Sequence, residues 1–169
     1  MPDIVIREAG PADAAAIHAL VLALAAFERA PDAVKASPED FLREGFGEVP
    51  SFHCLLAEVD GRPAGFALWF YNFSTWEGRR GIYLEDIFVQ EWARGLGLGE
   101  RLMRRLAATA LAEGCARLDL WVLHWNPARR FYERLGMQHM EEWLPYRVTG
   151  EALRRLAEAQ SDTSTHTKA

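Results

Sequence analysis

The sequence predicts an α/β (α+β) fold, a mixed sheet with helices on both faces. Strand-like and helix-like segments alternate along the chain, two long strand-like runs flank the tight-turn dipeptide Asp60-Gly61, and 50% of the 169 residues are hydrophobic. A chain of this length is sufficient for one complete core and short for two. We expect one domain over residues 1–160 and a disordered polar tail over 161–169.

The first part of the chain predicts one strand and two helices. Residues 4–7 are typical of a short strand, and Gly10-Pro11 begins a helix with apolar side chains at helical spacing. Ser37 before Pro38 begins a second, shorter helix, which ends at Gly45. The apolar stripe expected on the first helix consists of Ile17, Leu20, Val21, Leu24 and Phe27.

The middle of the chain predicts strands arranged around a hairpin. Residues 52–59 and 63–73 should pair antiparallel across Asp60-Gly61, because this dipeptide adopts the positive φ angles of a two-residue turn. Residues 74–80 then form a polar loop, and residues 82–89 form a further long strand.

The last part of the chain begins with a helix that follows a glycine-rich stretch. Its stripe of Leu98, Leu102, Leu106 and Ala110 predicts one buried face, and Gly114 ends it. The other elements expected are a strand over 118–123, a helix from Asn126-Pro127 to Gly136, strands over 138–143 and 146–148, and a terminal helix over 151–159.

Charge and cysteine content argue against several classes of function. A net charge of −5 disfavours nucleic acid, because phosphate binding depends on a surplus of Lys and Arg, and it suits a cationic small molecule better. Cys54 and Cys115 lie far apart without a Cys-x-x-Cys or Cys/His cluster, which indicates neither a zinc site nor a disulfide framework. We expect both to be small buried side chains.

The longest apolar runs are too short for a membrane span. Residues 19–27 and 65–73 fall well below the roughly 20 residues that cross a bilayer. The N-terminus also lacks a basic segment followed by an apolar block. We expect a cytoplasmic protein without a membrane partner.

The glycine-rich stretch before the long helix predicts an anion site. Glycines at every second position, Gly95, Gly97 and Gly99, allow backbone N–H groups to turn inward beside the positive end of the helix, and Arg94 adds a full charge. A flexible loop is the alternative. Glu100 stands where a dinucleotide motif needs glycine and a Walker motif needs lysine, so NAD and nucleoside triphosphates are disfavoured. A phosphate or pyrophosphate ligand is therefore expected.

Two motifs in this order resemble the GNAT family of N-acetyltransferases. The stretch RGLGLG after a strand is similar to the pyrophosphate loop of that family, with Arg94, Gly97 and Gly99 on the signature positions. The stretch WNPARRFYERLG, Trp125 to Gly136, is similar to its second motif. The segments that resemble the diamine acetyltransferase branch, which includes thialysine and spermidine/spermine acetyltransferases, are 45–59, 74–79 and 83–89.

The resemblance implies a GNAT-type, mostly antiparallel central sheet and direct transfer from acetyl-CoA to a primary amine in a ternary complex. It also implies a small-molecule amine as the acceptor, a homodimer, and no metal. The backbone of the strand before the loop would pair with the pantetheine arm. The residues implied in cofactor binding are Ile87, Phe88, Val89, Arg94, Gly95, Leu96, Gly97, Leu98, Gly99, Glu100, Asn126 and Tyr132.

The chemistry requires a base, because an aliphatic ammonium has a pKa of about 10.4 and cannot attack a thioester until it loses a proton. The resemblance assigns this step to Glu85, acting through water, and the binding of the cationic acceptor to Asp86. Neighbours in a regular strand face opposite sides, so both reach one pocket only if a bulge turns them. A pair of solvated acids is the alternative, although charge within this apolar run is unfavourable unless it is paired or functional.

Tyr132 is the expected general acid that protonates the departing CoA thiolate, on its position in the second motif. A core-facing aromatic beside Phe131 is the alternative. Asn126, implied in cofactor binding, has the alternative of a helix cap.

The acceptor is expected to lie against aromatic and acidic side chains. Ser74 stands where polyamine enzymes have an aspartate, which favours an amino-acid-like amine or a short diamine over spermine. The alternatives for the function are acetylation of a protein or peptide amine, and a non-catalytic acyl-CoA-binding module. The residues implied in acceptor binding are Phe27, Glu28, Trp76, Glu85, Asp86, Glu142 and Trp143.

Overall fold

The computed structural model describes residues 1–158, which fall into two compact units, Met1–Asn126 and the part of Pro127–Ala169 that is described. Each unit is described by itself. The tail expected over 161–169 lies outside the described residues, and the single domain over 1–160 stays a prediction.

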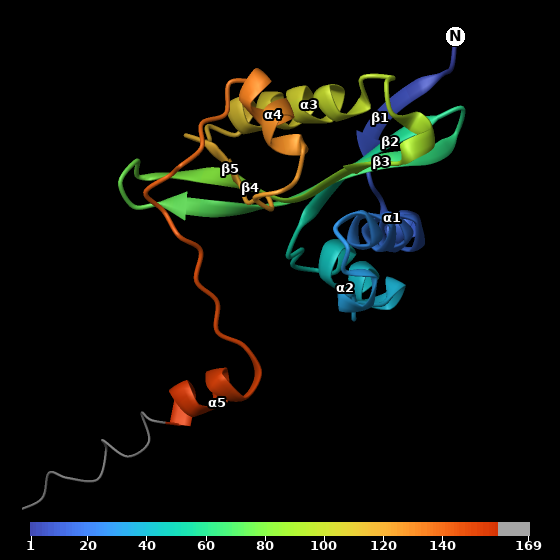
Figure 1. The fold of residues 1–169 in the computed structure, drawn as a ribbon. Coiled ribbons are helices and arrows are strands. Elements are labelled where there is room, and N and C mark those ends of the chain that lie inside the picture. The colour runs from blue at the N-terminus through green and yellow to red at the C-terminus, as the bar shows by residue number, and fades with distance from the viewer. Residues whose placement is uncertain (159–169) are drawn as a thin grey trace, which may run out of the picture. The chain divides into compact units, whose positions relative to one another are not determined.

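The first unit is built on a five-stranded mixed sheet whose strands lie side by side in chain order (Figure 1). The first four strands pair antiparallel, and the last pair, β4 with β5, is parallel. The expected mixed, mostly antiparallel sheet is therefore confirmed. The strands are β1 (Ile4–Glu8), β2 (His53–Val59), β3 (Arg62–Ser74), β4 (Arg79–Val89) and β5 (Leu118–Leu120).

The turn between β2 and β3 confirms the predicted hairpin. Asp60 and Gly61 both have positive φ angles, 51° and 75°, as a two-residue turn of this kind requires. Val59 and Arg62 pair directly across it. The next hairpin is tighter than expected, because β3 and β4 stay paired as far as Ser74 and Arg79, inside the predicted loop.

Helix α1 (Ala14–Phe27) covers one face of the sheet. Its buried side chains Ile17, Leu20 and Leu24 pack in one core with Phe66, and Val21 and Phe27 lie against the same core. The predicted stripe is therefore confirmed. The short helix α2 (Pro38–Phe46) contacts α1 and begins as expected at Ser37, whose hydroxyl accepts a hydrogen bond from the Asp40 N–H.

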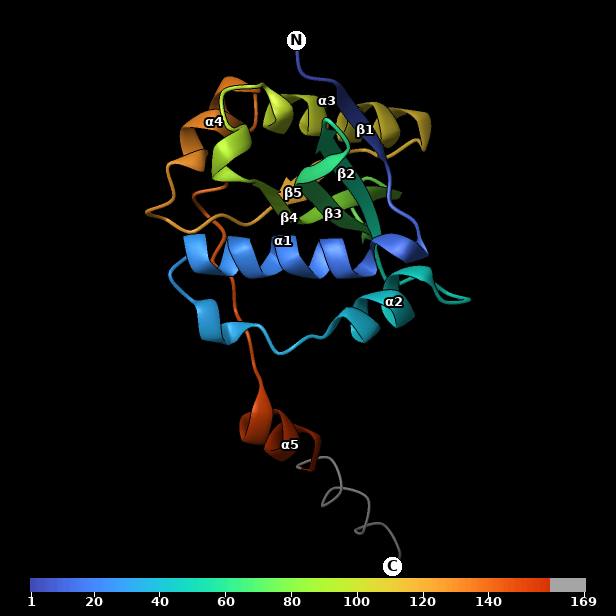
Figure 2. The same cartoon turned by 90° about the vertical axis from the view of Figure 1, so that its right-hand side faces the viewer.

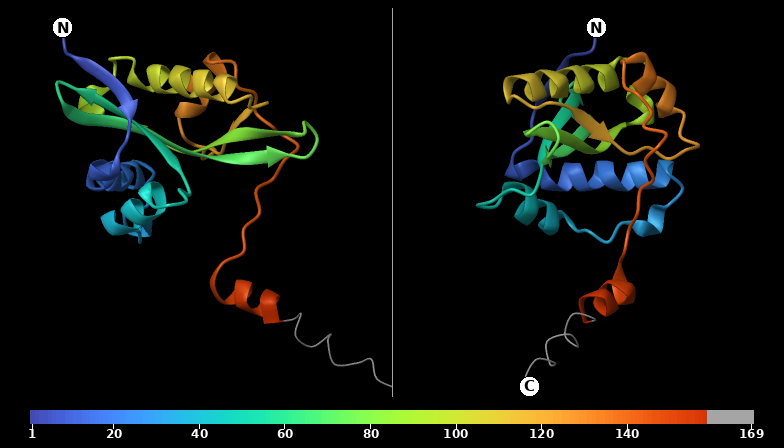
Figure 3. Two further views of the ribbon diagram at one scale, coloured as in Figure 1. Left: turned by 180° about the vertical axis from the view of Figure 1, so that it is seen from behind. Right: turned by 90° about the vertical axis from the view of Figure 1, so that its left-hand side faces the viewer.

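Helix α3 (Leu98–Ala112) covers the opposite face of the sheet (Figure 2). Figure 3 shows the same two-sided arrangement of α1 and α3 from behind and from the other side. The sandwich of helix, sheet and helix confirms the predicted fold class. The buried face of α3 is formed by the predicted stripe together with Met103: Leu98, Leu102, Leu106 and Ala110.

The second unit contains helix α4 (Ala128–Arg134) and helix α5 (Gly150–Glu158). The strands expected over 138–143 and 146–148 are wrong. A strand needs a partner for its N–H and C=O groups, and within residues 127–158 this segment instead makes a turn, with the Trp143 N–H donating to Met140 O at 3.1 Å. Trp143 is 67% and Tyr146 88% exposed, so no face of the segment is buried in this unit.

Strand β5 ends at Leu120, three residues before the expected end at Leu123. Its pairing with β4 covers only Ile82–Leu84, so the rest of β4 has no strand on that side within the first unit. In the described part of the chain, no helix is long and apolar enough to cross a membrane.

Candidate active site

A bulge in β4 separates its two adjacent acids from the regular strand pattern. Leu84 pairs with Trp69 and Asp86 pairs with Leu68, so Glu85 is the extra residue opposite the partner strand. Trp69 and Leu68 are neighbours and face opposite sides of the sheet. Asp86 therefore lies on the face of Leu68 and Phe88, which is the face covered by α1. This is the bulge that the site prediction required.

Beyond the bulge, β4 leaves main-chain groups on an open edge. The Gln90 N–H donates to Ala64 O at 2.8 Å, so Gln90 and Phe88 direct their main-chain groups toward β3. By alternation, Ile87 and Val89 direct theirs to the other side, where β5 does not reach. The open edge thus offers main-chain groups of Ile87 and Val89 to an extended ligand such as a pantetheine arm, with the Val89 carbonyl shared with Arg94.

The glycine-rich loop adopts a conformation that needs glycine at two positions. Gly95 and Gly97 have φ angles of 84° and 73°, in the left-handed region. An added Cβ at either would meet nothing within 4 Å, so the requirement is one of backbone conformation and not of space. Gly97 is the N-cap residue of α3, and its cap involves no side chain. The first N–H groups of α3 are therefore not capped by a side chain at this position.

The side chain of Arg94 connects the loop to β4 and α1. Its Nε donates to Val89 O at 3.3 Å, which is a main-chain oxygen of the open edge. Its guanidinium lies 5.0 Å from the ring centre of Phe27 and 5.9 Å from that of Phe88. Arg94, which is predicted to bind the acetyl donor, thus contacts Phe27, which is predicted to bind the acceptor amine.

Acidic side chains gather where α1 ends. Glu28 is the C-cap residue of α1, at the negative end of the helix dipole, and burial raises the pKa of its carboxyl. Burial, followed by the neighbouring carboxylates of Glu85 and Glu28, raises the pKa of Asp86 to about 7. Of the expected acceptor residues, Phe27, Glu28, Glu85 and Asp86 are therefore brought together. Their surroundings favour a positively charged ligand.

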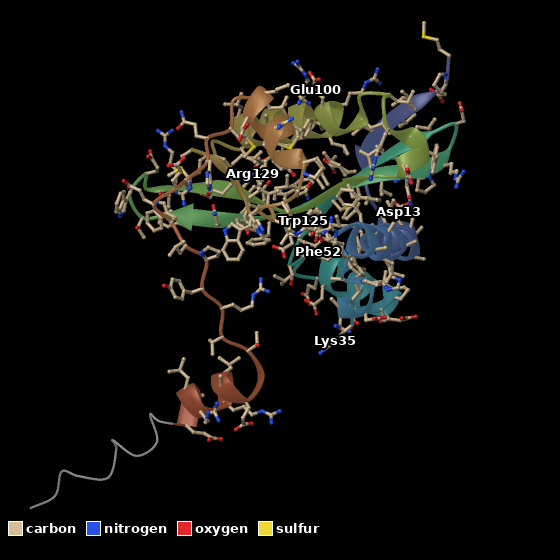
Figure 4. The ribbon with its side chains drawn as sticks, in the orientation of Figure 1. Asp13, Lys35, Phe52, Glu100, Trp125 and Arg129 are labelled. Carbon is tan, nitrogen blue, oxygen red and sulfur yellow. The ribbon has the colours of Figure 1, made fainter. Side chains whose placement is uncertain are left out.

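The end of α1 also contains a contact that sequence reasoning missed. Arg29 has a φ of 62° and ends the helix in a Schellman motif: its N–H donates to Ala26 O, and the Ala30 N–H donates to Ala25 O. Glycine is usual at this position. The Arg29 guanidinium lies 4.3 Å from the ring centre of Trp125, a residue labelled in Figure 4. No pattern in the sequence connects these two residues, since the contact depends on the tertiary fold.

Other expected acceptor residues lie elsewhere. Trp76 lies at the tip of the β3–β4 hairpin and is 90% exposed, so its side chain does not line a closed pocket in this structure. Ser74 is buried and structural, because its hydroxyl accepts hydrogen bonds from the Glu77 N–H and the Arg117 guanidinium. Glu142 and Trp143 belong to the exposed segment of the second unit.

The two residues of the second motif that are predicted to bind the cofactor, Asn126 and Tyr132, fall on either side of the boundary between the units. Asn126 is 8% exposed and ends the first unit, and its N–H donates to Leu123 O at 2.9 Å. Tyr132 lies half-buried on α4, with its ring centre 5.3 Å from that of Phe131. Helix α4 has Pro127 at its N-cap, so Asn126 precedes the cap by one position.

The cysteines do not present a nucleophile in this arrangement. Cys54 is buried in the core under α1, and burial raises the pKa of its thiol, which keeps it protonated. Cys115 is only half-buried, which corrects the expectation that both cysteines lie in the core. Residues 1–158 contain no group of three or more His, Cys, Asp or Glu side chains that could hold a metal ion.

Comparison with curated proteins gives close relatives over nearly the whole chain. Thialysine N-epsilon-acetyltransferase of Bos taurus is 41% identical over 169 residues, which cover 93% of this chain and 99% of that protein. The enzyme of the same name from Mus musculus is 42% identical over 164 residues, covering 90% and 96%. Spermidine/spermine N(1)-acetyltransferase-like protein 1 of Homo sapiens is 34% identical over 163 residues, covering 90% of this chain and 23% of that protein.

Solved structures share the fold. An integron cassette protein from the mobile metagenome of V. cholerae has a TM-score of 0.78 at 28% identity and covers 92% of this chain and 98% of its own. The aminoglycoside N-acetyltransferase AAC(6')-Iy, solved in complex with CoA, has a TM-score of 0.71 at 18% identity, with 89% and 97% covered, and supports the fold alone.

The family model described as "Acetyltransferase (GNAT) family" matches residues 18–137, from α1 to the end of the second motif. This range includes the β4 bulge, the open edge and the glycine-rich loop. The chain therefore belongs to the GNAT family and is an acetyl-CoA-dependent N-acetyltransferase that acetylates a small-molecule amine.

Proposed function

We propose that the acceptor is a lysine-like amino acid, such as thialysine, that presents a primary ammonium to the acidic residues at the end of α1. The observation that carries this proposal is the gathering of Glu28, Glu85 and Asp86 beside the negative end of that helix. The names of the bovine and murine relatives support the same acceptor. Ser74, engaged in the hairpin, leaves no further carboxylate for a polyamine at that position.

The donor is held by main-chain groups. The open edge of Ile87 and Val89 pairs with the pantetheine arm of acetyl-CoA, and the amides of Gly95 to Glu100, with Arg94, bind its pyrophosphate. These contacts use peptide groups that are not paired within the sheet or the helix. Most of the acetyl-CoA molecule is therefore bound without any particular protein side chain. Asn126 completes the set from the end of the first unit.

The reaction is a direct transfer without a covalent enzyme intermediate. The ammonium loses a proton to the β4 carboxylates, with Glu85 acting through water and Asp86 holding the cation. The free amine then attacks the thioester carbonyl, the nitrogen gives up its second proton to water, the C–S bond breaks, and Tyr132 protonates the CoA thiolate. Transfer of this kind needs only groups that move protons and hold charge.

The protein acts as a cytoplasmic homodimer in this proposal, and the exposed Glu142 and Trp143 contribute to the acceptor site. Trp76, exposed at the hairpin tip, packs on the alkyl chain of the acceptor. Light scattering of the purified chain tests the dimer, which requires a mass twice that of the 19.1 kDa chain.

A thiol-release assay with acetyl-CoA and a panel of amines tests the acceptor. We expect kcat/KM to be highest for thialysine and lysine, lower for putrescine and spermidine, and lowest for spermine and for a lysine-containing peptide. Spermine as the best acceptor would contradict the interpretation of Ser74, and the peptide as the best acceptor would favour a protein acetyltransferase.

Tyr132→Phe separates an enzyme from a non-catalytic acyl-CoA-binding module. The variant should lose about 10²-fold in kcat, within the range for one general acid, and keep its affinity for acetyl-CoA in calorimetry. A wild-type protein that binds acetyl-CoA and acetylates none of the amines would support the binding module instead.

A further inference from the structure

Glu85 and Asp86 occupy different environments although they are adjacent. The bulge leaves Glu85 exposed, whereas it directs Asp86 to the face covered by α1, opposite Leu68. In a regular strand the two would simply face opposite sides. Here Glu85 contacts solvent and Asp86 lies against the apolar core. The two carboxyl groups therefore connect the protein interior with the solvent.

The surroundings of Asp86 contain acids from two elements and a thiol from a third. Glu85 on its own strand and Glu28 at the end of α1 are the charged groups that act on it. Cys54 on β2 is the other titratable group that interacts with it, and its thiol is neutral. The partner residue Leu68 on β3 is apolar. Burial and the carboxylates of Glu85 and Glu28 therefore oppose the negative charge of Asp86. A cation placed on the same face is Arg94, whose guanidinium lies 5.9 Å from the ring centre of Phe88.

We propose that Asp86 is the first proton acceptor of the reaction and that Glu85 returns this proton to solvent through water. The proposal rests on the proposed function, and it changes the role of Asp86 from holding the cation to accepting its proton.

The proton balance of the proposed step is simple. The substrate ammonium gives a proton to an Oδ of the Asp86 carboxylate, which becomes a neutral acid, and the amine nitrogen keeps its electron pair. That pair forms the N–C bond, the nitrogen gives up its second proton to solvent water, the C–S bond breaks, and the thiolate takes the proton of Tyr132. Asp86 then passes its proton through a water molecule to the Glu85 carboxylate, which releases it to solvent, and the phenol of Tyr132 is restored by a proton from solvent.

The physical advantage is a smaller difference in pKa between the substrate ammonium, which donates the proton, and the Asp86 carboxylate, which accepts it. Proton transfer from an amine with a pKa of about 10.4 is strongly uphill to an ordinary carboxylate, and each unit by which the carboxyl pKa rises makes it tenfold less unfavourable. Asp86, with a pKa of about 7, is suited to this step at neutral pH. Above pH 7 Asp86 is mostly ionised in the free protein, so its carboxylate can accept a proton when the substrate arrives.

A titration by carbon NMR tests the first half of the proposal without turnover. With aspartate labelled at Cγ, the free wild-type protein should show one carboxyl that titrates near pH 7. The signal should be absent in Asp86→Asn, remain in Glu85→Gln, and remain in the control Asp32→Asn, an exposed aspartate outside the site. If no aspartate titrates above pH 6, the proposal is overturned.

Profiles of kcat/KM against pH test the second half. The wild type and Asp32→Asn should rise with an inflection near pH 7, and Glu85→Gln should keep the inflection with a loss of about tenfold. Asp86→Asn should lose the inflection and about 10²–10³-fold in kcat/KM. An inflection that survives in Asp86→Asn and disappears in Glu85→Gln would make Glu85 the first acceptor and overturn the proposal.

Two further measurements keep these outcomes distinct. Calorimetry with acetyl-CoA should give Asp86→Asn the wild-type affinity, and if that variant does not fold, Glu28→Gln replaces it and should move the NMR midpoint to lower pH. A failure of the proposed acceptor appears as no turnover of lysine-like amines by the wild type. A failure of the present proposal appears as turnover whose pH dependence does not involve Asp86.

Discussion

The two ends of helix α1 shift the pKa of nearby carboxyl groups in opposite directions. At its start, Asp13 accepts hydrogen bonds from Arg7 at 2.7 and 2.9 Å and from the Gly10 N–H at 2.7 Å, and Arg7 also binds Glu58 at 2.7 Å. These bonds, that from Arg7 first, lower the pKa of Asp13. At its end, burial raises the pKa of Glu28, and Asp86 lies nearby with a raised pKa.

This difference separates an element of folding from an element of function. The start of α1 places each acid beside a cation or an N–H group, in the orientation that the helix dipole favours. The end of α1 does the reverse, because acids gather at the negative end of the helix. An arrangement that is unfavourable in the free protein is the one that a cationic substrate would relieve, so the less stable end is the better binding site.

Replacing Arg7 with Met should break the favourable end and has the largest expected effect on stability. The variant leaves Asp13 and Glu58, both 17% exposed, without their cation, and should lower the free energy of unfolding by about 2–3 kcal/mol at pH 7. The contribution of the lowered Asp13 pKa is present above the ordinary value of 3.8 and is lost as the pH falls below it. Urea unfolding at pH 7 and pH 3 should therefore show the difference shrinking in acid. A constant difference would contradict the role of Asp13.

Replacing Asp86 with Asn should have the opposite sign. The folded protein holds a proton on Asp86 up to about pH 7, whereas the unfolded chain releases it near 3.8, so the wild type loses stability as the pH rises between these values. The variant should be more stable than the wild type by about 2 kcal/mol at pH 8, with allowance for solvent screening, and by less at pH 5. Equal pH dependence in both proteins would show that Asp86 is not perturbed.

Replacing Gly97 with Ala tests a third helix end, the start of α3. Gly61→Ala is the matched control, because both glycines have φ near 75° and open space for a Cβ. Each change should lower the free energy of unfolding by about 1 kcal/mol. Only Gly97→Ala should weaken acetyl-CoA binding in calorimetry. An equal affinity in both variants would place the pyrophosphate elsewhere.

Replacing Glu100 with Gln should have the smallest effect. The carboxylate of Glu100, which is labelled in Figure 4, binds the exposed Arg104 guanidinium at 2.7 Å across one turn of α3. Exposed pairs at this spacing contribute less than about 0.5 kcal/mol. Chemical unfolding in low and high salt should give nearly equal values for variant and wild type. A loss above 1 kcal/mol would show that this surface pair resembles the Arg7 cluster.

Sequence reasoning predicted the parts of the fold that local chemistry determines. The Asp60-Gly61 turn, the apolar stripes of α1 and α3, and the cap at Ser37 depend on residues close in the chain. The strands expected over 138–148 were wrong, because alternation indicates a face and does not supply a partner strand. In the site, the need for a bulge was foreseen. The raised pKa of Asp86 and the contact of Arg29 with Trp125 were not, since they depend on residues that only the fold brings together.

The short β5 has a consequence for what can pair with the end of β4. An unpaired strand edge is a template on which another chain can add a strand and begin an aggregate. Apart from the outer strands β1 and β5, the open edge on β4 is limited to the few residues between the bulge at Glu85 and the end of β4 at Val89. A bulge at one end and a strand terminus at the other leave too little ladder for a foreign strand to extend, while a slender ligand still fits.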